Sequence, residues 1–223
     1  MKSLPPLLIT SAVTVASNNL TRLSLVPDRL SYTADGIDNW LRIVPDLRIV
    51  ICDGSGYDLN SFVSQRWPGS QIEVLSFLND TEKVAVFGKG FGEGQIIDYA
   101  LKNSRFLLEQ DVFMKCTSKL WVSNFESIMT SCNGTRFNIR TKPTGAESRR
   151  FSWVDTRFYS VTKEFFATNL ADAYKSVNRL EKHYIEHAYL EALISAGVVN
   201  DVLFPKKPII KGVSGSFGVE HKN

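Results

Sequence analysis

The feature that most constrains the fold is an alternation of short apolar runs with segments of helical character through the first 130 residues. Four runs rich in Val, Ile, Leu and Phe are expected to be strands, at residues 7–15, 47–52, 72–77 and 112–116. Strands that alternate with helices form βαβ units, and these units build a mostly parallel sheet flanked by helices. The sequence therefore predicts a single α/β domain of the Rossmann-like kind.

The clearest helix is expected to begin at Pro27 and to end before Pro45, because proline suits the first turn and cannot continue a helix. The apolar residues between these prolines recur every three or four positions, so they share one helical face. They are Leu30, Ala34, Ile37, Leu41 and Val44. Further helices are expected at 61–67, after the glycine run 88–94, at 120–129 and, as a long buried helix, at 174–196.

The second part of the chain is less regular. Residues 133–147 are polar and rich in turn formers, with a strand expected near 137–140 and another within 153–161. Thr162 is a candidate cap for a short helix. The tail 204–218 contains two prolines and three glycines, and we expect it to be a loop outside the core.

The net charge of +3 lacks the clustered cations of a nucleic-acid-binding protein. It suits an anionic ligand or an anionic membrane face, and an ordinary solvated surface explains it equally well. The apolar stretch 4–16 resembles a short signal peptide, but Pro5 and Pro6 interrupt it and favour a first core strand. No apolar run reaches the ~18 residues that span a bilayer. We expect a cytoplasmic protein with peripheral contact at the inner membrane.

The three cysteines form no CxxC pair and no metal-ligand spacing, so we expect them to be buried and reduced. They are Cys52, Cys116 and Cys132. The chain contains no Asp-x-Asp pair, the usual metal ligand of nucleotide-sugar enzymes. His183 and His187 stand four residues apart without an HExxH pattern. We therefore expect no metal site and no cofactor.

Ligands of parallel α/β sheets bind beyond the carboxyl ends of the strands, which directs attention to three places. The first is Asp53, which either accepts hydrogen bonds from a ribose or a base or, as we favour, caps a turn. The second is the glycine run with Lys89. Its spacing matches neither GxGxxG nor a P-loop, and an anion-binding helix start and a flexible turn are equally supported.

The third place is Lys115-Cys-Thr-Ser-Lys119, expected at the end of a strand and the start of a helix. Its two ammonium groups and two hydroxyls could neutralise a diphosphate, although a solvated helix start is the simpler alternative. Glu186 and His187 lie within the expected long helix. Glu186 is either a base that deprotonates an acceptor hydroxyl or, as we favour from the residues alone, a surface carboxylate beside a core histidine.

Taken in order, these motifs resemble a family of bacterial glycosyltransferases of lipopolysaccharide O-antigen and capsule biosynthesis. The resemblance covers nearly the whole chain. It rests on Gly88-Lys-Gly-Phe-Gly-Glu-Gly94, Lys115 to Lys119, Asp155-Thr-Arg157, Glu186-His187 and Ser214-Gly-Ser216. It implies a compact, GT-A-like, metal-independent enzyme.

The resemblance implies a role for each of these motifs. Donor-binding residues would be Thr10, Asp53, Lys89, Glu93, Thr117, Lys119, Ser214 and Ser216, the last two in a closing loop. Catalytic residues would be Lys115, Glu186 and His187, and Asp155 and Arg157 would shape the acceptor side. Ser118 and Lys119 depart from the family's glycine and arginine, and a lysine cannot make the bidentate fork of an arginine to a phosphate.

Residues 1–130 are then expected to bind the nucleotide sugar, and residues 131–223 to form the acceptor side with a long helix and a closing loop. The expected activity is transfer of a sugar from a nucleotide-sugar donor to a glycan or lipid-linked glycan of a surface polysaccharide, without nucleic acid as a partner. A non-catalytic nucleotide- or glycan-binding protein on the same fold is the alternative. A classical dinucleotide enzyme is disfavoured by the glycine spacing.

Overall fold

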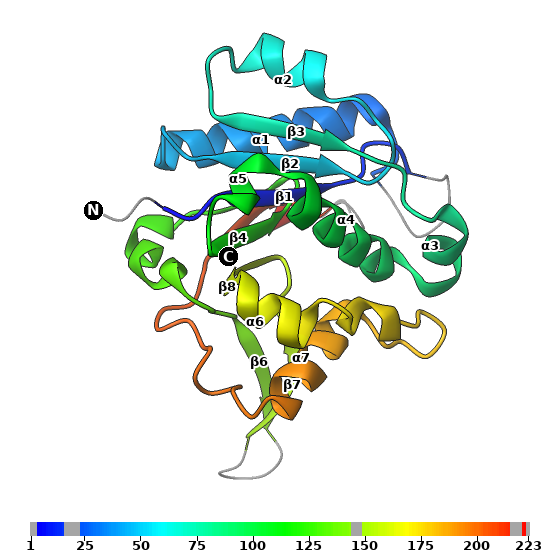
Figure 1. Cartoon of the computed structure of the whole chain (residues 1–223), viewed down its shortest axis with the longest axis vertical. Helices are drawn as coiled ribbons and strands as arrows, with labels where there is room; N and C mark the ends of the chain where they lie inside the picture. The colour runs from blue at the N-terminus through cyan, green and yellow to red at the C-terminus, as the bar shows by residue number, and fades with distance from the viewer. Residues whose placement is uncertain (1–3, 16–22, 144–148, 215–219, 222–223) are drawn as a thin grey trace.

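The computed structural model describes residues 4–15, 23–143, 149–214 and 220–221. A five-stranded sheet with the strand order β3-β2-β1-β4-β8 forms the centre of the molecule (Figure 1). Its strands are β1 (Leu7–Ser11), β2 (Ile49–Asp53), β3 (Ile72–Ser76), β4 (Val112–Thr117) and β8 (Phe158–Thr162). The first four are parallel and β8 is antiparallel to β4. The expected α/β fold with a mostly parallel sheet is confirmed.

Helices cover both faces of this sheet (Figure 1). On one face α1 (Val26–Ile43) packs Ile37 and Trp40 against Leu7 and Ile9 of β1. On the other face α4 (Lys89–Asn103) packs with α7 (Ile185–Ser195) around a second apolar cluster. Successive strand residues point to opposite faces, so both faces of β1 are apolar and both must be covered.

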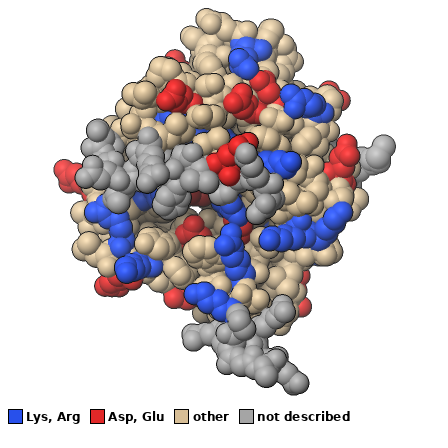
Figure 2. All heavy atoms as spheres, turned by 180° about the vertical axis from the view of Figure 1, so that it is seen from behind, with Lys and Arg blue, Asp and Glu red and all other residues tan. Residues whose placement is uncertain are grey.

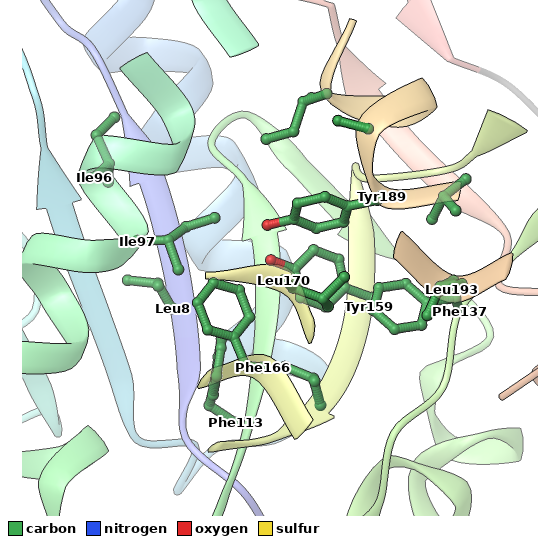
Figure 3. Close-up of a cluster of buried hydrophobic side chains, with 14 of the residues drawn as sticks. Leu8, Ile96, Ile97, Phe113, Phe137, Tyr159, Phe166, Leu170, Tyr189 and Leu193 are labelled. Atoms are coloured by element: carbon green, nitrogen blue, oxygen red, sulfur yellow. The ribbon is translucent and has the colours of Figure 1, made fainter. Parts of the chain in front are cut away.

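The cluster on the α4 face joins the two parts of the chain (Figure 3). Leu8 and Ile97 come from the first 130 residues, whereas Tyr159 and Tyr189 come from β8 and α7. The two tyrosine rings lie 6.0 Å apart, and both hydroxyls point toward α4 (Figure 3). The two halves expected from the sequence therefore share one core.

Several short elements follow from local capping. α2 (Asn60–Arg66) lies where a helix was expected. Thr162 caps α6 (Lys163–Phe165), since its hydroxyl accepts a hydrogen bond from the Phe165 N–H at 3.2 Å. The short α5 (Arg105–Leu108) is capped by Ser104. The sequence analysis missed α3 (Thr81–Phe87), which Asp80 caps by accepting from the Lys83 N–H at 3.0 Å.

The expected helix at 120–129 is wrong. The chain forms β5 (Leu120–Val122) and two 3₁₀ turns, η1 (Phe125–Ser127) and η2 (Met129–Asn133). β5 pairs with β9 (Ile210–Val213), which in turn pairs with β10 (Glu220–His221). The tail is therefore not a loop outside the core. Its Phe204 stacks on Phe158 at 5.8 Å, and Ile210 is buried. Pairing between segments 90 residues apart leaves no local signal.

The long helix expected at 174–196 is also wrong. η3 (Phe166–Leu170) and η4 (Ala173–Ser176) precede a tight turn in which Asn178 and His183 exchange backbone hydrogen bonds. Lys182 in this turn has φ = 56°, outside helical geometry, so α7 begins only at Ile185. The hairpin of β6 (Ile139–Pro143) and β7 (Arg149–Val154) extends away from the central sheet, with β7 beside α7 (Figure 1).

Candidate functional site

The carboxyl ends of three neighbouring strands bring the candidate residues together. Ser11 of β1 pairs in register with Asp53 of β2, and Thr10 pairs with Thr117 of β4. Lys115 and Thr117 share the face of β4 that carries Phe113, which belongs to the α4-side core. Lys119 instead packs against α1. The site therefore consists of two clusters, one on each face of the sheet.

The α1-side cluster consists of Arg29, Asp53, Ser118 and Lys119. The Asp53 carboxylate is fully buried, and it accepts hydrogen bonds from the backbone N–H groups of Val13 and Ser55, each at 2.8 Å. It also accepts from the Ser55 hydroxyl. These bonds tie the loops after β1 and β2 together, as in the turn-capping alternative for this residue.

Lys119 lies where the chain leaves β4, and it adopts φ = 72°, unusual for a residue with a side chain. Only 4% of its surface is exposed, and its ammonium donates a hydrogen bond to the Ser118 hydroxyl at 2.8 Å. Burial, together with the nearby charge of Arg29, lowers the pKa of Lys119 to about 7, and the charge of Asp53 acts in the opposite direction.

Two glycines allow the backbone to pass so closely here. A Cβ on Gly36 of α1 would lie 3.3 Å from the Cα of Lys119. A Cβ on Gly212 of β9 would lie 2.0 Å from the carbonyl oxygen of Lys119, and Gly212 itself has φ = 113°. Val213 donates its N–H to the Lys119 carbonyl at 3.2 Å, which places the end of β9 beside Lys119.

Arg29 is the residue of this cluster that the sequence analysis missed. Its Nε donates to the carbonyl of Ala12 and its Nη1 to that of Leu23, both at 2.7 Å. Burial lowers its pKa, an effect that Asp53 partly offsets. The buried face of α1 includes Ala34 and Ile37 of the expected apolar face and extends beside it to Arg29, Thr33 and Trp40. The spacing 29, 33, 37, 40 was the available signal.

The α4-side cluster is centred on Lys115, whose side chain is fully buried. Its ammonium forms an ion pair with Glu93 and donates to the Thr117 hydroxyl at 2.9 Å and the Thr156 carbonyl at 2.8 Å. An ammonium has three protons, so these partners use all of them. The strand expected at 112–116 is confirmed and continues to Thr117 as β4, so Lys115 lies within the strand.

Glu186 borders this cluster from the first turn of α7. Burial raises the pKa of its carboxyl, and the charge of Glu93 raises it further, whereas Lys89 and Lys115 act in the opposite direction. Glu93 and the exposed Lys89 both lie in the first turns of α4. The structure thus brings together four charged residues from three separate motifs of the sequence.

Asp155 and Arg157 form a bidentate pair beside this cluster. Nε and Nη2 of Arg157 donate to the two carboxylate oxygens at 2.8 and 2.6 Å, and Asp155 is only 4% exposed. Burial alone would raise the pKa of Asp155, but the hydrogen bonds and charge of Arg157 outweigh it and lower the pKa. The pair raises the pKa of Arg157, and Glu186 adds a smaller effect of the same sign.

The remaining candidates lie as follows. His187 accepts a hydrogen bond from the Tyr184 N–H through Nδ1 at 3.1 Å, so it caps α7. Thr10 is 4% exposed in β1, and its carbonyl accepts from the Ser118 N–H at 3.0 Å. Ser214 follows β9, and Ser216 lies outside the described residues.

The glycine run is neither a flexible turn nor a loop before a helix. Gly88, with φ = 103°, begins α4, and the other glycines lie inside its first turns. A Cβ on Gly90 would lie 3.0 Å from the Cβ of Ile185, and one on Gly94 would lie 2.1 Å from the Tyr174 ring. The run therefore lets α4 approach α7 and η4 closely, which places Glu93 next to Lys115.

The face seen in Figure 2 is hollowed near its centre, with acidic side chains within the hollow and Lys and Arg side chains around it. A separate hollow of about 310 Å³ lies before the amino ends of the strands, away from both clusters. Its lining residues are Leu4, Val44, Asp46, Leu47, Arg48 and Gln71.

Across the described ranges, no group of three or more His, Cys, Asp or Glu side chains is placed to hold a metal ion. The three cysteines are buried free thiols, as expected, and burial raises the pKa of each to about 12. Within the same ranges, no helix is long and apolar enough to cross a membrane.

Comparison with known proteins places the fold. No protein-family model and no curated protein matches the chain. Among solved structures, the inositol-1-phosphate CTP transferase from T. maritima matches 88% of this chain and 84% of its own, with a TM-score of 0.50 and 10% identity. A protein described as a nucleotide-diphospho-sugar transferase from Desulfovibrio desulfuricans G20 matches 86% of this chain and 76% of its own, with a TM-score of 0.47 and 12% identity. At such identities the likeness concerns the fold alone.

Proposed function

We propose that the chain is a transferase acting on a nucleotide-activated substrate, and specifically a glycosyltransferase. The observation that carries the proposal is the pair of buried cations, Lys119 and Arg29, beside Asp53 at the carboxyl ends of β1, β2 and β4. Ligands of parallel α/β sheets bind at that edge. The T. maritima protein of similar fold transfers a nucleotide, which supports the coarser part of this proposal.

The α1-side cluster is suited to stabilise the nucleotide diphosphate that leaves during sugar transfer. When a sugar leaves a nucleotide diphosphate, negative charge grows on the phosphate oxygens, and positioned cations stabilise it. Charges buried from water act more strongly than charges on the surface. Arg29 is held by hydrogen bonds to two backbone carbonyls, and Lys119 by the close packing of its backbone between Gly36 and Gly212, so both need little rearrangement during the reaction.

The α4-side cluster suits the acceptor. Glu186 has a raised pKa, so its carboxyl is a stronger base than an ordinary surface carboxylate. We assign to it the removal of the proton from the acceptor hydroxyl. Lys115, with all three protons engaged, acts by positioning Glu93 and the Thr156 loop rather than by touching the donor. Asp155 and Arg157 fix the wall of this side.

The acceptor we propose is a glycan or lipid-linked glycan of a bacterial surface polysaccharide or lipopolysaccharide, as the motif order suggests. Cations in place of a carboxylate pair after β4 support transfer without a divalent metal. Peripheral contact with the inner membrane belongs to the same proposal, because a lipid-linked acceptor would be presented there.

Two functions other than glycosyl transfer are the alternatives. The fold of the T. maritima protein also suits nucleotidyl transfer, in which a nucleoside triphosphate loses pyrophosphate. A non-catalytic nucleotide- or glycan-binding protein is the second alternative, and the unusual Ser118 and Lys119 favour it.

The test is incubation with a panel of nucleotide sugars and with excess EDTA, followed by assay of free nucleoside diphosphate. We expect one donor to be hydrolysed or transferred at a rate that EDTA leaves unchanged. Loss of activity that manganese restores would refute metal independence. Pyrophosphate release from a nucleoside triphosphate and a sugar phosphate would establish nucleotidyl transfer instead. Tight binding without turnover would establish the binding protein.

A further inference from the structure

Lys119 is confined more tightly than an ordinary ligand-binding lysine. Its backbone lies between Gly36 of α1 and Gly212 of β9, and 4% of its surface is exposed. Two charged groups act on its ammonium, Arg29 from α1 and Asp53 at the end of β2. β9 adds only the uncharged Gly212 and Val213 at this point. The ammonium donates a hydrogen bond to the Ser118 hydroxyl, which is neutral.

The carboxylate of Asp53, the one acidic group of this cluster, already has hydrogen-bond partners. Asp53 accepts hydrogen bonds from Val13 and Ser55, so its carboxylate is shared with backbone donors. Two buried cations therefore face one carboxylate, which leaves an excess of positive charge in a place shielded from water. Such an excess is costly unless an anion enters or one cation loses its proton.

Two hydroxyls in the same region are buried and unpartnered within the described part of the chain. Ser11, 3% exposed, ends β1 on the face that carries Leu7 and Ile9, which α1 covers. Thr33, 1% exposed, lies one turn after Arg29 on the buried face of α1. Buried hydroxyls without partners are rare in proteins, and both of these can donate a hydrogen bond to an acceptor oxygen of an anionic ligand.

We propose that the α1-side cluster holds a phosphate of the nucleotide between Lys119 and Arg29, and that binding draws a proton from solution onto Lys119. The nucleotide in this proposal rests on the proposed function; the proton uptake goes beyond it. At neutral pH the empty cluster exists partly with a neutral Lys119 amine, because its pKa is about 7. An anion beside the amine favours the charged form, so phosphate binding and protonation reinforce each other.

The direction in which anion affinity changes with pH follows from the two protonation states of Lys119. Below pH 7 Lys119 already carries its proton, so affinity for the anion is insensitive to pH. Above pH 7 binding must take up a proton, and affinity falls by up to about tenfold per pH unit. An arginine at this position keeps its charge throughout this range, so Lys119→Arg removes the dependence. Lys119→Gln has no charge at any pH and gives the lower limit of affinity.

The experiment is isothermal titration of the full chain with inorganic pyrophosphate, which needs no knowledge of the nucleoside. Wild type, Lys119→Arg and Lys119→Gln are compared from pH 6 to 8.5, and at pH 7 in buffers of different ionisation enthalpy. We expect equal affinities for wild type and Lys119→Arg at pH 6, and about a tenfold advantage for Lys119→Arg at pH 8. At pH 7 wild type should take up about half a proton more than Lys119→Arg. Proton exchange by pyrophosphate itself cancels in that comparison.

Equal affinity of wild type and Lys119→Arg across the pH range would overturn the proton linkage, whether or not nucleotide sugars are turned over. Absence of pyrophosphate binding by both would overturn the phosphate site itself. Binding with the expected linkage but without turnover of any nucleotide sugar would support this inference and refute the proposed activity. Should Lys119→Arg fail to fold, as judged by circular dichroism, the wild-type advantage over Lys119→Gln must still shrink between pH 6 and 8.5.

Discussion

Lys115 and Lys119 lie four residues apart, yet the structure uses them in different ways. Lys115 is inside β4 and gives all its protons to Glu93, Thr117 and Thr156. Lys119 follows the strand with φ = 72° and donates a hydrogen bond to the neutral Ser118 hydroxyl. The difference arises because the pleat and the turn after β4 direct them to opposite faces of the sheet. Only one of the two is suited to receive an anion.

Lys115→Met should destabilise the protein by about 2–4 kcal/mol, because it leaves Glu93 and the Thr156 carbonyl without their donor. Urea unfolding followed by circular dichroism measures the effect. Adding Glu93→Gln should recover part of the loss. The matched control is Lys102→Ala on the exposed side of α4, whose pair with Asp98 is worth about 0.3–0.5 kcal/mol. Similar losses for Lys115→Met and Lys102→Ala would show that the buried network contributes little.

Glu186→Gln should lower kcat by about 10²–10⁴-fold if Glu186 is the base, and should leave donor binding nearly unchanged. A base must be deprotonated to act, and the pKa of Glu186 is raised. The acidic limb of the wild-type pH–rate profile should therefore have its midpoint above 4.5, and the variant should lack that limb. Glu191→Gln, exposed on the same helix, is the control and should retain activity. A normal rate for Glu186→Gln would remove this residue from the mechanism.

At the scale of elements, α4 shows why glycines in alternate positions need not mark a phosphate loop. Gly90 and Gly94 lie inside the helix and leave room for Ile185 and Tyr174. Glycine lowers helix propensity by about 1 kcal/mol relative to alanine, and close packing offsets that cost. The close approach is what places Glu93 of α4 against Lys115 of β4.

Gly94→Ala should therefore destabilise the protein by about 1–3 kcal/mol, although alanine is the better helix former. Its Cβ would lie 2.1 Å from the Tyr174 ring, so either η4 or α4 must shift. Thermal unfolding measures the loss. Gly134→Ala is the matched control, because no atom lies within 4 Å of its Cβ position and its φ of −156° suits alanine. A stabilised Gly94→Ala variant would show that the contact with Tyr174 is easily relieved.

At the scale of the whole molecule, the division at residue 130 does not separate two cores. β8 pairs with β4 from Val112 to Cys116, and Tyr159 and Tyr189 pack into the cluster that contains Leu8 and Ile97. β9 returns from the end of the chain to pair with β5. The residues expected to bind the donor and those expected on the acceptor side are therefore built on one continuous framework.

A fragment of residues 1–130 should consequently fail to fold alone. It would expose the apolar α4 face of the sheet and the open edge of β4. We expect no cooperative thermal transition and poor dispersion of its amide proton resonances, in contrast to the full chain. Mixing it with residues 131–223 should restore part of the cooperative signal. A fragment that unfolds cooperatively by itself would show that the first half is an independent domain.

Much of the fold was predictable because its signals are local. The apolar runs of β1 to β4, the prolines around α1 and the Thr162 cap act over a few residues. Among the candidate positions, the same holds for Asp53 and Lys115, which lie in or at the end of predicted strands. It does not hold for Lys119 and Glu186, because the helices expected at 120–129 and 174–196 are wrong. The sequence by itself determined the α/β class and the strands that carry Asp53 and Lys115.

The tertiary structure decided what each of these residues contacts. β5 and β9 pair although about 90 residues separate them in the chain, so residues 120–122, where a helix was expected to begin, form a strand. The packing of distant segments brings Lys115 close to Glu93, and Lys119 close to Arg29 and Asp53. No local sequence pattern encodes that packing. Burial, pKa and pairing depend on which distant segments meet. Chain order alone does not specify which segments meet, and the two lysines of one short motif therefore have different contacts.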